Sequence, residues 1–108
     1  MAIHLPAPVA AFFDAKTHHD IAAILAPFAE DARVSDERTD HQGREAIRAW
    51  IEETQRKYAD IATPEASFVD GDTIVVRATV SGTFPGSPIL LTHRFKLAGD
   101  KIAELRIG

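Results

Sequence analysis

The sequence predicts an α+β fold, with helices packed on one face of a curved and mostly antiparallel sheet. Apolar residues recur at helical spacing, about every 3.6 residues, through the first half of the chain and alternate with a period of two in the second half. Helices followed by a run of strands are typical of α+β proteins. No repeat, linker or low-complexity tract interrupts the 108 residues, so residues 1–108 are expected to form a single domain.

Three helices are expected in the first half. The stretch "VAAFFDAK" starts the first one, with apolar residues on one side. Asp20 is a suitable N-cap for "IAAILAPFAED", in which Pro27 argues for a short helix or one that ends near that point. Gly43 precedes the longest helix, "REAIRAWIEETQRKYAD", whose inward stripe is Ile47, Trp50, Ile51, Thr54 and Tyr58.

Strands are expected in the second half. They are a short "EASFV", then "TIVVRATVSGTF", "ILLTHRFKL" and "IAELRIG", separated by the turn sequences "DGD", "PGSP" and "AGDK". Alternation assigns two sets of residues to the inner face of the sheet. These are Ile74, Val76, Ala78, Val80, Gly82 and Phe84 on one strand, and Ile89, Leu91, His93, Phe95 and Leu97 on the next.

Composition excludes several classes of protein. Twelve basic and sixteen acidic residues give a net charge of −4 without a basic cluster, which argues against nucleic acid or an anionic membrane as partner. The absence of cysteine excludes disulfides, thiolate catalysis and cysteine-ligated zinc. We expect no membrane span and no signal peptide, and hence a cytoplasmic protein. No metal-ligand, dinucleotide or P-loop motif is present, so neither a metal nor a cofactor is predicted.

Three segments carry a family resemblance: "FFDAKTHHDIAAILAPFAEDARVSD", "GREAIRAW" and "HRFKLAGDKIAEL". In this order and spacing they resemble the SnoaL-like polyketide cyclases and their relatives in the NTF2-like superfamily, which includes the ketosteroid isomerases. The resemblance covers nearly the whole chain. It implies that three helices close against a strongly curved sheet to form a cone with a mostly apolar pocket. It also implies a small apolar or carbonyl-containing ligand and a homodimer packed through the sheet.

Asp36 is the first candidate catalytic residue. Counted without a gap through "FAEDARVSD", it falls where isomerase-type relatives carry a proton-shuttling aspartate. A carboxylate at the mouth of an apolar pocket is desolvated, which raises its pKa and suits it to act as a base near neutral pH. The alternative is a solvated hairpin residue. The rest of the isomerase site differs, because Phe12 stands at the position of the tyrosine donor and His93 at that of the neutral acid.

His93 is the second candidate catalytic residue, because strand alternation turns it inward among apolar neighbours. It could polarise a carbonyl, or act as a base that Asp36 orients. The alternative is a core histidine that pairs with a backbone carbonyl. His41 is expected as a polar companion of Asp36 on the same hairpin, with solvent exposure as the alternative. The residues expected to contact a ligand are Phe12, Trp50, Ala78, Val80, Phe95, Leu105 and His41.

Two classes of function fit these residues. In the first, a cofactor-free enzyme uses Asp36 to remove a proton beside a carbonyl or to activate water, as an isomerase, an aldol-type cyclase or a hydrolase. Epoxide opening fits least, because relatives of that type need an Asp-Arg-Asp set that the inner strand faces do not offer. In the second, the chain is a noncatalytic module that binds an apolar metabolite or acts as a dimeric scaffold. The Val75, Leu90 and Thr92 side of the sheet offers a mildly apolar surface for a dimer.

Overall fold

The computed structural model describes residues 5–108. The helices are α1 (Ala7–Thr17), α2 (Ile21–Leu25) and α3 (Arg44–Tyr58). The strands are β1 (Phe28–Asp36), β2 (Thr39–Gln42), β3 (Ile61–Asp70), β4 (Thr73–Ser81), β5 (Ile89–Ala98) and β6 (Lys101–Ile107). None of the helices in this part of the chain is both long enough and apolar enough to cross a membrane.

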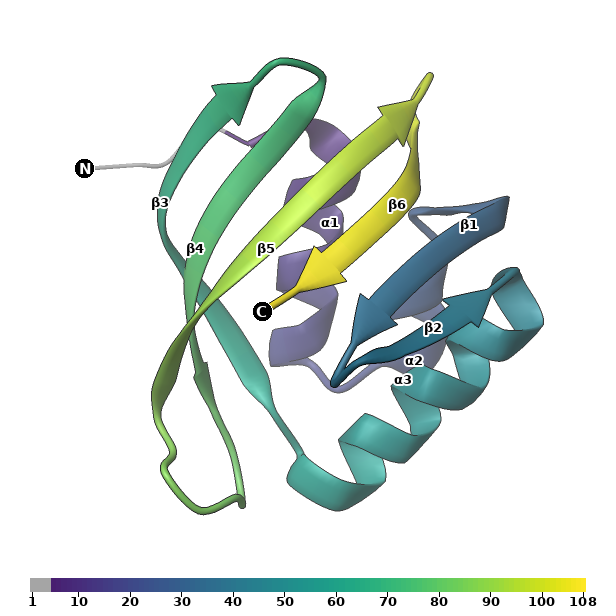
Figure 1. Cartoon of the computed structure of the whole chain (residues 1–108). Coiled ribbons are helices and arrows are strands. Elements are labelled where there is room, and N and C mark those ends of the chain that lie inside the picture. Colours follow the sequence, from purple (N-terminus) through teal and green to yellow (C-terminus); the bar gives the residue numbers. More distant parts are fainter. Residues whose placement is uncertain (1–4) are drawn as a thin grey trace.

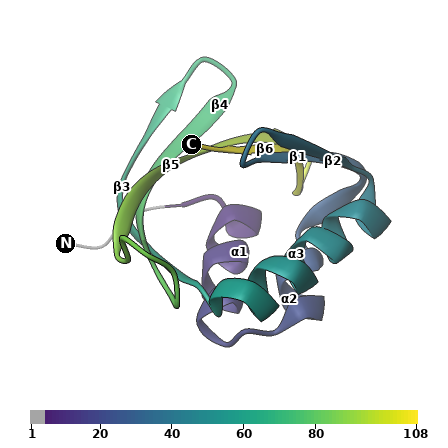
Figure 2. The ribbon, with the colours of Figure 1, turned by 60° about the horizontal axis from the view of Figure 1, so that its bottom comes forward.

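The strands form a single curved sheet in the order β2-β1-β6-β5-β4-β3 (Figure 1). All neighbouring strands are antiparallel except β1 and β6, which are parallel. The sheet bends around α1 and α3, so that the helices cover its concave side (Figure 2). This arrangement confirms the predicted α+β fold with helices on a curved, mostly antiparallel sheet.

The second helix is shorter than the segment "IAAILAPFAED" suggested. Asp20 caps it as predicted, by accepting a hydrogen bond from the Ala23 amide at 3.1 Å. The helix ends at Leu25, and the chain enters β1 at Phe28. The helix thus ends near Pro27, as the sequence predicted, and the residues after Pro27 belong to β1. The Pro27 carbonyl instead accepts a hydrogen bond from the Ile102 amide at 2.8 Å, which leads the chain into its parallel pairing with β6.

The strand predicted as "EASFV" is longer than expected, because β3 starts at Ile61 and runs through Pro64. Pro64 is tolerated within β3 because β3 is an edge strand, where a missing amide hydrogen costs little. The register with β4 also shifts between Pro64 and Ala66, which marks an irregularity at Glu65.

The polar segment "VSDERTDHQG" is a hairpin made of the end of β1, a two-residue turn and β2. Glu37 and Arg38 both have positive φ values, +51° and +63°. Positive φ at both central residues suits the right-handed twist of two-residue hairpins. Asp36 is the last residue of β1 and pairs with Thr39 across this turn. The turn therefore fixes the candidate carboxylate at the end of a strand in the main sheet.

The core lies between α1 and the concave face of the sheet. Phe12 makes edge-to-face contacts with Phe13, Phe28 and Phe95, with ring centroids 5.3–5.8 Å apart. This aromatic group continues to His93, whose ring lies 5.3 Å from that of Phe13. The inner faces of β1 and β5 thus pack against α1.

Candidate active site

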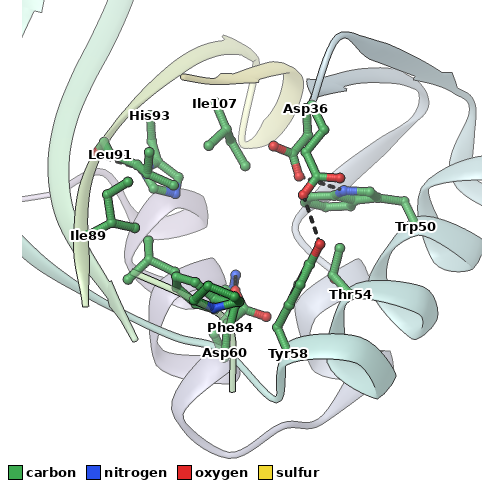
Figure 3. Close-up of a pocket in the computed structure, with 14 residues that line it drawn as sticks. Asp36, Trp50, Thr54, Tyr58, Asp60, Phe84, Ile89, Leu91, His93 and Ile107 are labelled. Atoms are coloured by element: carbon green, nitrogen blue, oxygen red, sulfur yellow. Dashed lines mark hydrogen bonds and ion pairs between the residues drawn. The ribbon is translucent and has the colours of Figure 1, made fainter. Parts of the chain in front are cut away.

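A pocket of about 340 Å³ lies between α3 and the concave face of the sheet (Figure 3). Its volume is at the small end of the range for ligand pockets, roughly 300–1,000 Å³. Polar groups and apolar side chains share its wall. The lining residues are Lys16, Asp36, Glu37, Trp50, Thr54, Tyr58, Asp60, Val80, Phe84, Pro85, Ile89, Leu91, His93 and Ile107.

Asp36 lines this pocket at the end of β1 and is partly buried. The indole Nε1 of Trp50 donates a hydrogen bond to Asp36 Oδ2 at 3.1 Å, which fixes the carboxylate against α3. Burial raises the pKa of the Asp36 carboxyl above its ordinary value of 3.8. The Trp50 hydrogen bond opposes the rise in pKa, the charge of Glu37 adds to it, and the charge of Lys16 opposes it. Asp36 is thus a held carboxylate whose charged form is disfavoured by desolvation.

Tyr58 and Phe84 form the wall next to Asp36. The Tyr58 hydroxyl donates a hydrogen bond to Glu37 Oε1 at 3.2 Å, and its ring meets Phe84 edge-on with centroids 5.6 Å apart. The loop that carries Phe84 is attached to the end of α3, because the Thr83 amide donates to the Tyr58 carbonyl at 2.8 Å. The hairpin turn, α3 and the β4–β5 loop are therefore joined around one side of the pocket.

His93 lies on the opposite wall from Asp36, with Ile107 between them (Figure 3). Its side chain is buried, and its Nδ1 lies 3.4 Å from the Leu91 carbonyl oxygen. Burial, aided by the charge of Lys16, lowers the pKa of His93 to about 4, so the ring is neutral near pH 7. Within residues 5–108 no hydrogen bond joins Asp36 to His93. The structure thus gives no direct contact through which Asp36 would orient His93, whereas the alternative pairing of His93 with a backbone carbonyl is present.

A buried ion pair between Lys16 and Asp60 also borders the pocket. Lys16 Nζ lies 2.5 Å from Asp60 Oδ2, and both side chains are at most one-tenth exposed. Neither residue was predicted to belong to a site. A signal was available for Lys16, because it continues the buried face of α1 after Val9, Phe12 and Phe13 at helical spacing. No local pattern indicates its partner, which is 44 residues away in the sequence.

The predicted ligand-contacting residues divide into three groups. Trp50 and Val80 line the pocket. His41 lies outside it, in a second hollow of about 380 Å³, with its ring 6.0 Å from that of Trp50. The remaining four are fully buried in the core and do not line the pocket, because the aromatic side chains of α1 pack directly against the middle of the sheet; they are Phe12, Ala78, Phe95 and Leu105.

Several lining residues were not predicted as ligand contacts. Tyr58 and Thr54 lie on the apolar stripe of α3, and Leu91 and Ile89 lie on the inner face of β5, so the patterns placed these residues correctly without indicating a pocket. Within residues 5–108, no group of three or more His, Asp or Glu side chains could hold a metal ion.

The chain is similar to known proteins over nearly its whole length. Residues 9–105 match the SnoaL-like domain family. A candidate polyketide cyclase from Sinorhizobium meliloti is 44% identical, with a TM-score of 0.91 over 96% of this chain and 95% of that one. No curated protein matches the chain.

More distant structures share the fold. A protein with a ketosteroid isomerase-like fold from Catenulispora acidiphila, solved with trimethylamine, is 22% identical, with a TM-score of 0.83 over 97% of this chain and 86% of that one. An NTF2-like protein from Cytophaga hutchinsonii is 16% identical, with a TM-score of 0.80 over 100% of this chain and 91% of that one. The family match confirms the resemblance seen in the sequence: the chain shares its fold with NTF2-like and ketosteroid isomerase-like structures, and it belongs to the SnoaL-like domain family.

Proposed function

We propose that the protein is a cofactor-free enzyme of the isomerase or cyclase type, which moves a proton beside the carbonyl group of a small, largely apolar ligand. The observation that carries this proposal is the Asp36 carboxylate, held by Trp50 inside a pocket that raises its pKa. The similarity to the Sinorhizobium meliloti candidate polyketide cyclase supports a ligand of the polyketide class.

Asp36 is suited to both halves of a proton transfer. The carboxylate accepts hydrogen bonds from Trp50 Nε1, at Oδ2, and from the Glu37 backbone, and its remaining lone pairs can receive a proton from a carbon next to the ligand carbonyl. A carboxyl group whose pKa is raised toward neutral pH is a stronger base than an exposed one and can also return the proton. Return to a different carbon is an isomerisation. Alternatively, the enolate carbon attacks a second carbonyl and forms a C–C bond, and the alkoxide left on that carbonyl oxygen takes the proton from Asp36, which is an aldol-type cyclisation.

Epoxide opening is not part of the proposal. The reaction was expected to need an Asp-Arg-Asp set, and no arginine is among the residues that line the pocket in the described part of the chain.

The proposal is tested by α-deuterium exchange, which needs no knowledge of the natural substrate. A panel of cyclic and aryl ketones is incubated with the protein in D₂O, and deuterium uptake beside the carbonyl is measured by NMR. The unmodified protein is expected to accelerate exchange of at least one ketone. Asp36→Asn should lose this acceleration by about 100-fold or more, the usual contribution of a general base.

The control for this test is binding of the same ketone. The side-chain amide oxygen introduced by Asp36→Asn can still accept the Trp50 hydrogen bond, so this variant should bind the ketone as the unmodified protein does. Ketones that bind without exchange would contradict an enzymatic role and would favour the noncatalytic binding module.

A further inference from the structure

The pocket contains a fixed positive charge for which the proposed reaction has so far no role. The ammonium group of Lys16 is held by Asp60 Oδ2 at 2.5 Å. The other carboxylate oxygen, Oδ1, accepts a hydrogen bond from Gln55 Nε2 at 3.1 Å, and Gln55 Oε1 lies 2.7 Å from His19 Nδ1. Asp60, the residue before β3, therefore holds the ammonium group, and Gln55 of α3 holds Asp60 in turn.

Lys16 has hydrogen-bonding capacity left for a ligand. An ammonium group has three N–H donors. Among residues 5–108 its one hydrogen-bond acceptor is the carboxylate of Asp60. Lys16 lines the pocket, and its charge lowers the pKa of both Asp36 and His93, which are on opposite walls. Its field therefore reaches both sides of the space in which a ligand would sit.

The other polar groups of the pocket are less suited to stabilise an oxyanion. The indole N–H of Trp50 is committed to Asp36, and the hydroxyl of Tyr58 is committed to Glu37. His93 is a neutral ring whose Nδ1 is next to the Leu91 carbonyl. Phe12, one helical turn before Lys16 on α1, has no donor at all. Lys16 is the cation in this wall, and cations are the stronger donors to a developing negative charge.

We propose that Lys16 is the electrophilic residue of this site and that its ammonium group donates a hydrogen bond to the carbonyl oxygen of the ligand. This proposal rests on the proposed function. When Asp36 takes the proton from the neighbouring carbon, the C–H electron pair becomes the C=C bond of an enolate and the negative charge moves to the oxygen. Lys16 keeps its proton throughout, and Asp60 and Gln55 are the positioning residues that hold it. The charge is lost from the oxygen when Asp36 returns the proton to carbon.

Phenols test this role without a known substrate, because a phenolate has the planar oxyanion of an enolate. The experiment uses the Asp36→Asn protein, whose neutral amide stands for the carboxyl group after it has taken the proton. Absorbance measures the ratio of phenolate to phenol for bound 4-nitrophenol and for the free compound at the same pH. We expect the Asp36→Asn protein to favour the bound phenolate. Adding Lys16→Gln together with Asp60→Asn should reduce this preference about 10- to 100-fold, the size of a charge-assisted hydrogen bond.

The matched control is Lys96→Met, which removes an exposed lysine on the face of β5 away from the pocket and should leave the preference unchanged. The charges of Lys16 and Asp60 are removed together so that no lone charge stays buried. If that variant does not fold, ¹⁵N NMR of the Lys16 ammonium group in the Asp36→Asn protein replaces it, and the Lys16 signal should shift on addition of 4-nitrophenol while that of Lys96 stays constant.

The role of Lys16 is contradicted if the phenolate preference persists without Lys16, if the Lys16 signal does not respond, or if 4-nitrophenol does not bind to the Asp36→Asn protein. These outcomes are distinct from a failure of the proposed function, because the base is already absent from the protein used. Loss of α-deuterium exchange in Asp36→Asn together with a Lys16-independent phenolate preference would leave Asp36 as the base and remove Lys16 from the mechanism.

Discussion

The Asp36 side chain is held in one position, although the pocket disfavours its charged form. Trp50 and the end of β1 fix the carboxylate, while burial raises its pKa. Because the folded chain binds this proton more tightly than the unfolded chain does, ionisation of Asp36 with rising pH lowers the stability of the fold. A residue that costs stability in its working form is typical of an active site.

His93 has the opposite effect on stability as the pH falls. Its pKa is about 4 in the folded chain and 6.5 in the reference state. Above about pH 6.5 the ring is neutral in both states, and the free energy of unfolding is at its full value. As the pH falls toward 4, the unfolded chain takes up the proton first, so the free energy of unfolding decreases. The difference between these two pKa values corresponds to a loss of about 3 kcal/mol in the free energy of unfolding, at 1.36 kcal/mol per pKa unit.

We predict that the free energy of unfolding of His93→Gln falls less steeply than that of the unmodified protein as the pH is lowered from 6.5 to 4. Urea unfolding at several pH values measures this slope. His18→Gln, which removes an exposed histidine from the α1–α2 connection, is the matched control for the loss of an imidazole. Equal slopes for His93→Gln and the unmodified protein would show that the ring takes up protons as readily in the folded state as in the unfolded one.

The candidate base could be predicted from the sequence because its position follows from a local count along α2 and β1. Lys16 has a local signal in the buried face of α1, but its significance depends on Asp60, which only the folded chain brings near it. The same holds for Glu37 and Tyr58, which are joined across the hairpin and α3. Contacts between distant elements, rather than residue type, therefore limited the prediction of the site.

At the scale of elements, the end of α3 and the β4–β5 loop fit closely at Gly82. Alternation placed this glycine on the inner face of the predicted strand "TIVVRATVSGTF", but β4 ends one residue earlier, at Ser81. In the structure a Cβ at this position would lie 2.5 Å from the Tyr58 carbonyl oxygen and 3.2 Å from Asp60 Cα. The glycine thus permits a close approach of two backbones and not extra pocket volume.

We predict that Gly82→Ala destabilises the protein by about 1–3 kcal/mol, the usual cost of overpacking. The backbone must move to relieve the contact, which would also disturb the Thr83 hydrogen bond to the Tyr58 carbonyl. Chemical denaturation measures the loss, with the exposed neighbour Ser81→Ala as control. An alanine at position 82 with unchanged stability would contradict the close packing of these two elements.

Helices and strands with a regular apolar pattern could be predicted from the sequence, whereas the starts of two strands that lie near a proline could not. The bounds of α3 and the inner face of β4 followed from regular periodicity and a glycine before the helix. The starts of β1 at Phe28 and of β3 at Ile61, each close to a proline, were not predicted, although Pro27 correctly indicated that α2 ends near it. In both places the proline is accommodated by sheet pairing, through an edge position and through a carbonyl that bonds to β6.

At the scale of the whole molecule, the outer face of the sheet has exposed apolar side chains. Phe68 and Leu90 are each more than half exposed, and strand pairing places Phe68 beside Val75 and Leu90 beside Thr79. We propose that this face packs against a second copy of the chain, as the family resemblance implies. Val75 itself is buried within the single chain and adds little to such a surface.

We predict that Leu90→Glu converts a homodimer into a monomer, because it puts a charge into the apolar centre of the interface. Light scattering coupled to size-exclusion chromatography measures the mass, and Lys96→Met on the same face is a control that adds no charge. A monomeric unmodified protein, or a Leu90→Glu variant that stays dimeric, would exclude this surface as the interface.

The central claim is that the helix-covered pocket disfavours the charged form of the Asp36 carboxylate and so makes it a base. The most direct measurement is a pH titration of the aspartate side-chain carboxyl carbons by ¹³C NMR, with the Asp36 signal assigned from its absence in Asp36→Asn. We expect its pKa to lie above the ordinary value of 3.8. A pKa at or below 3.8 would place the carboxylate in a solvated environment and contradict the mechanism.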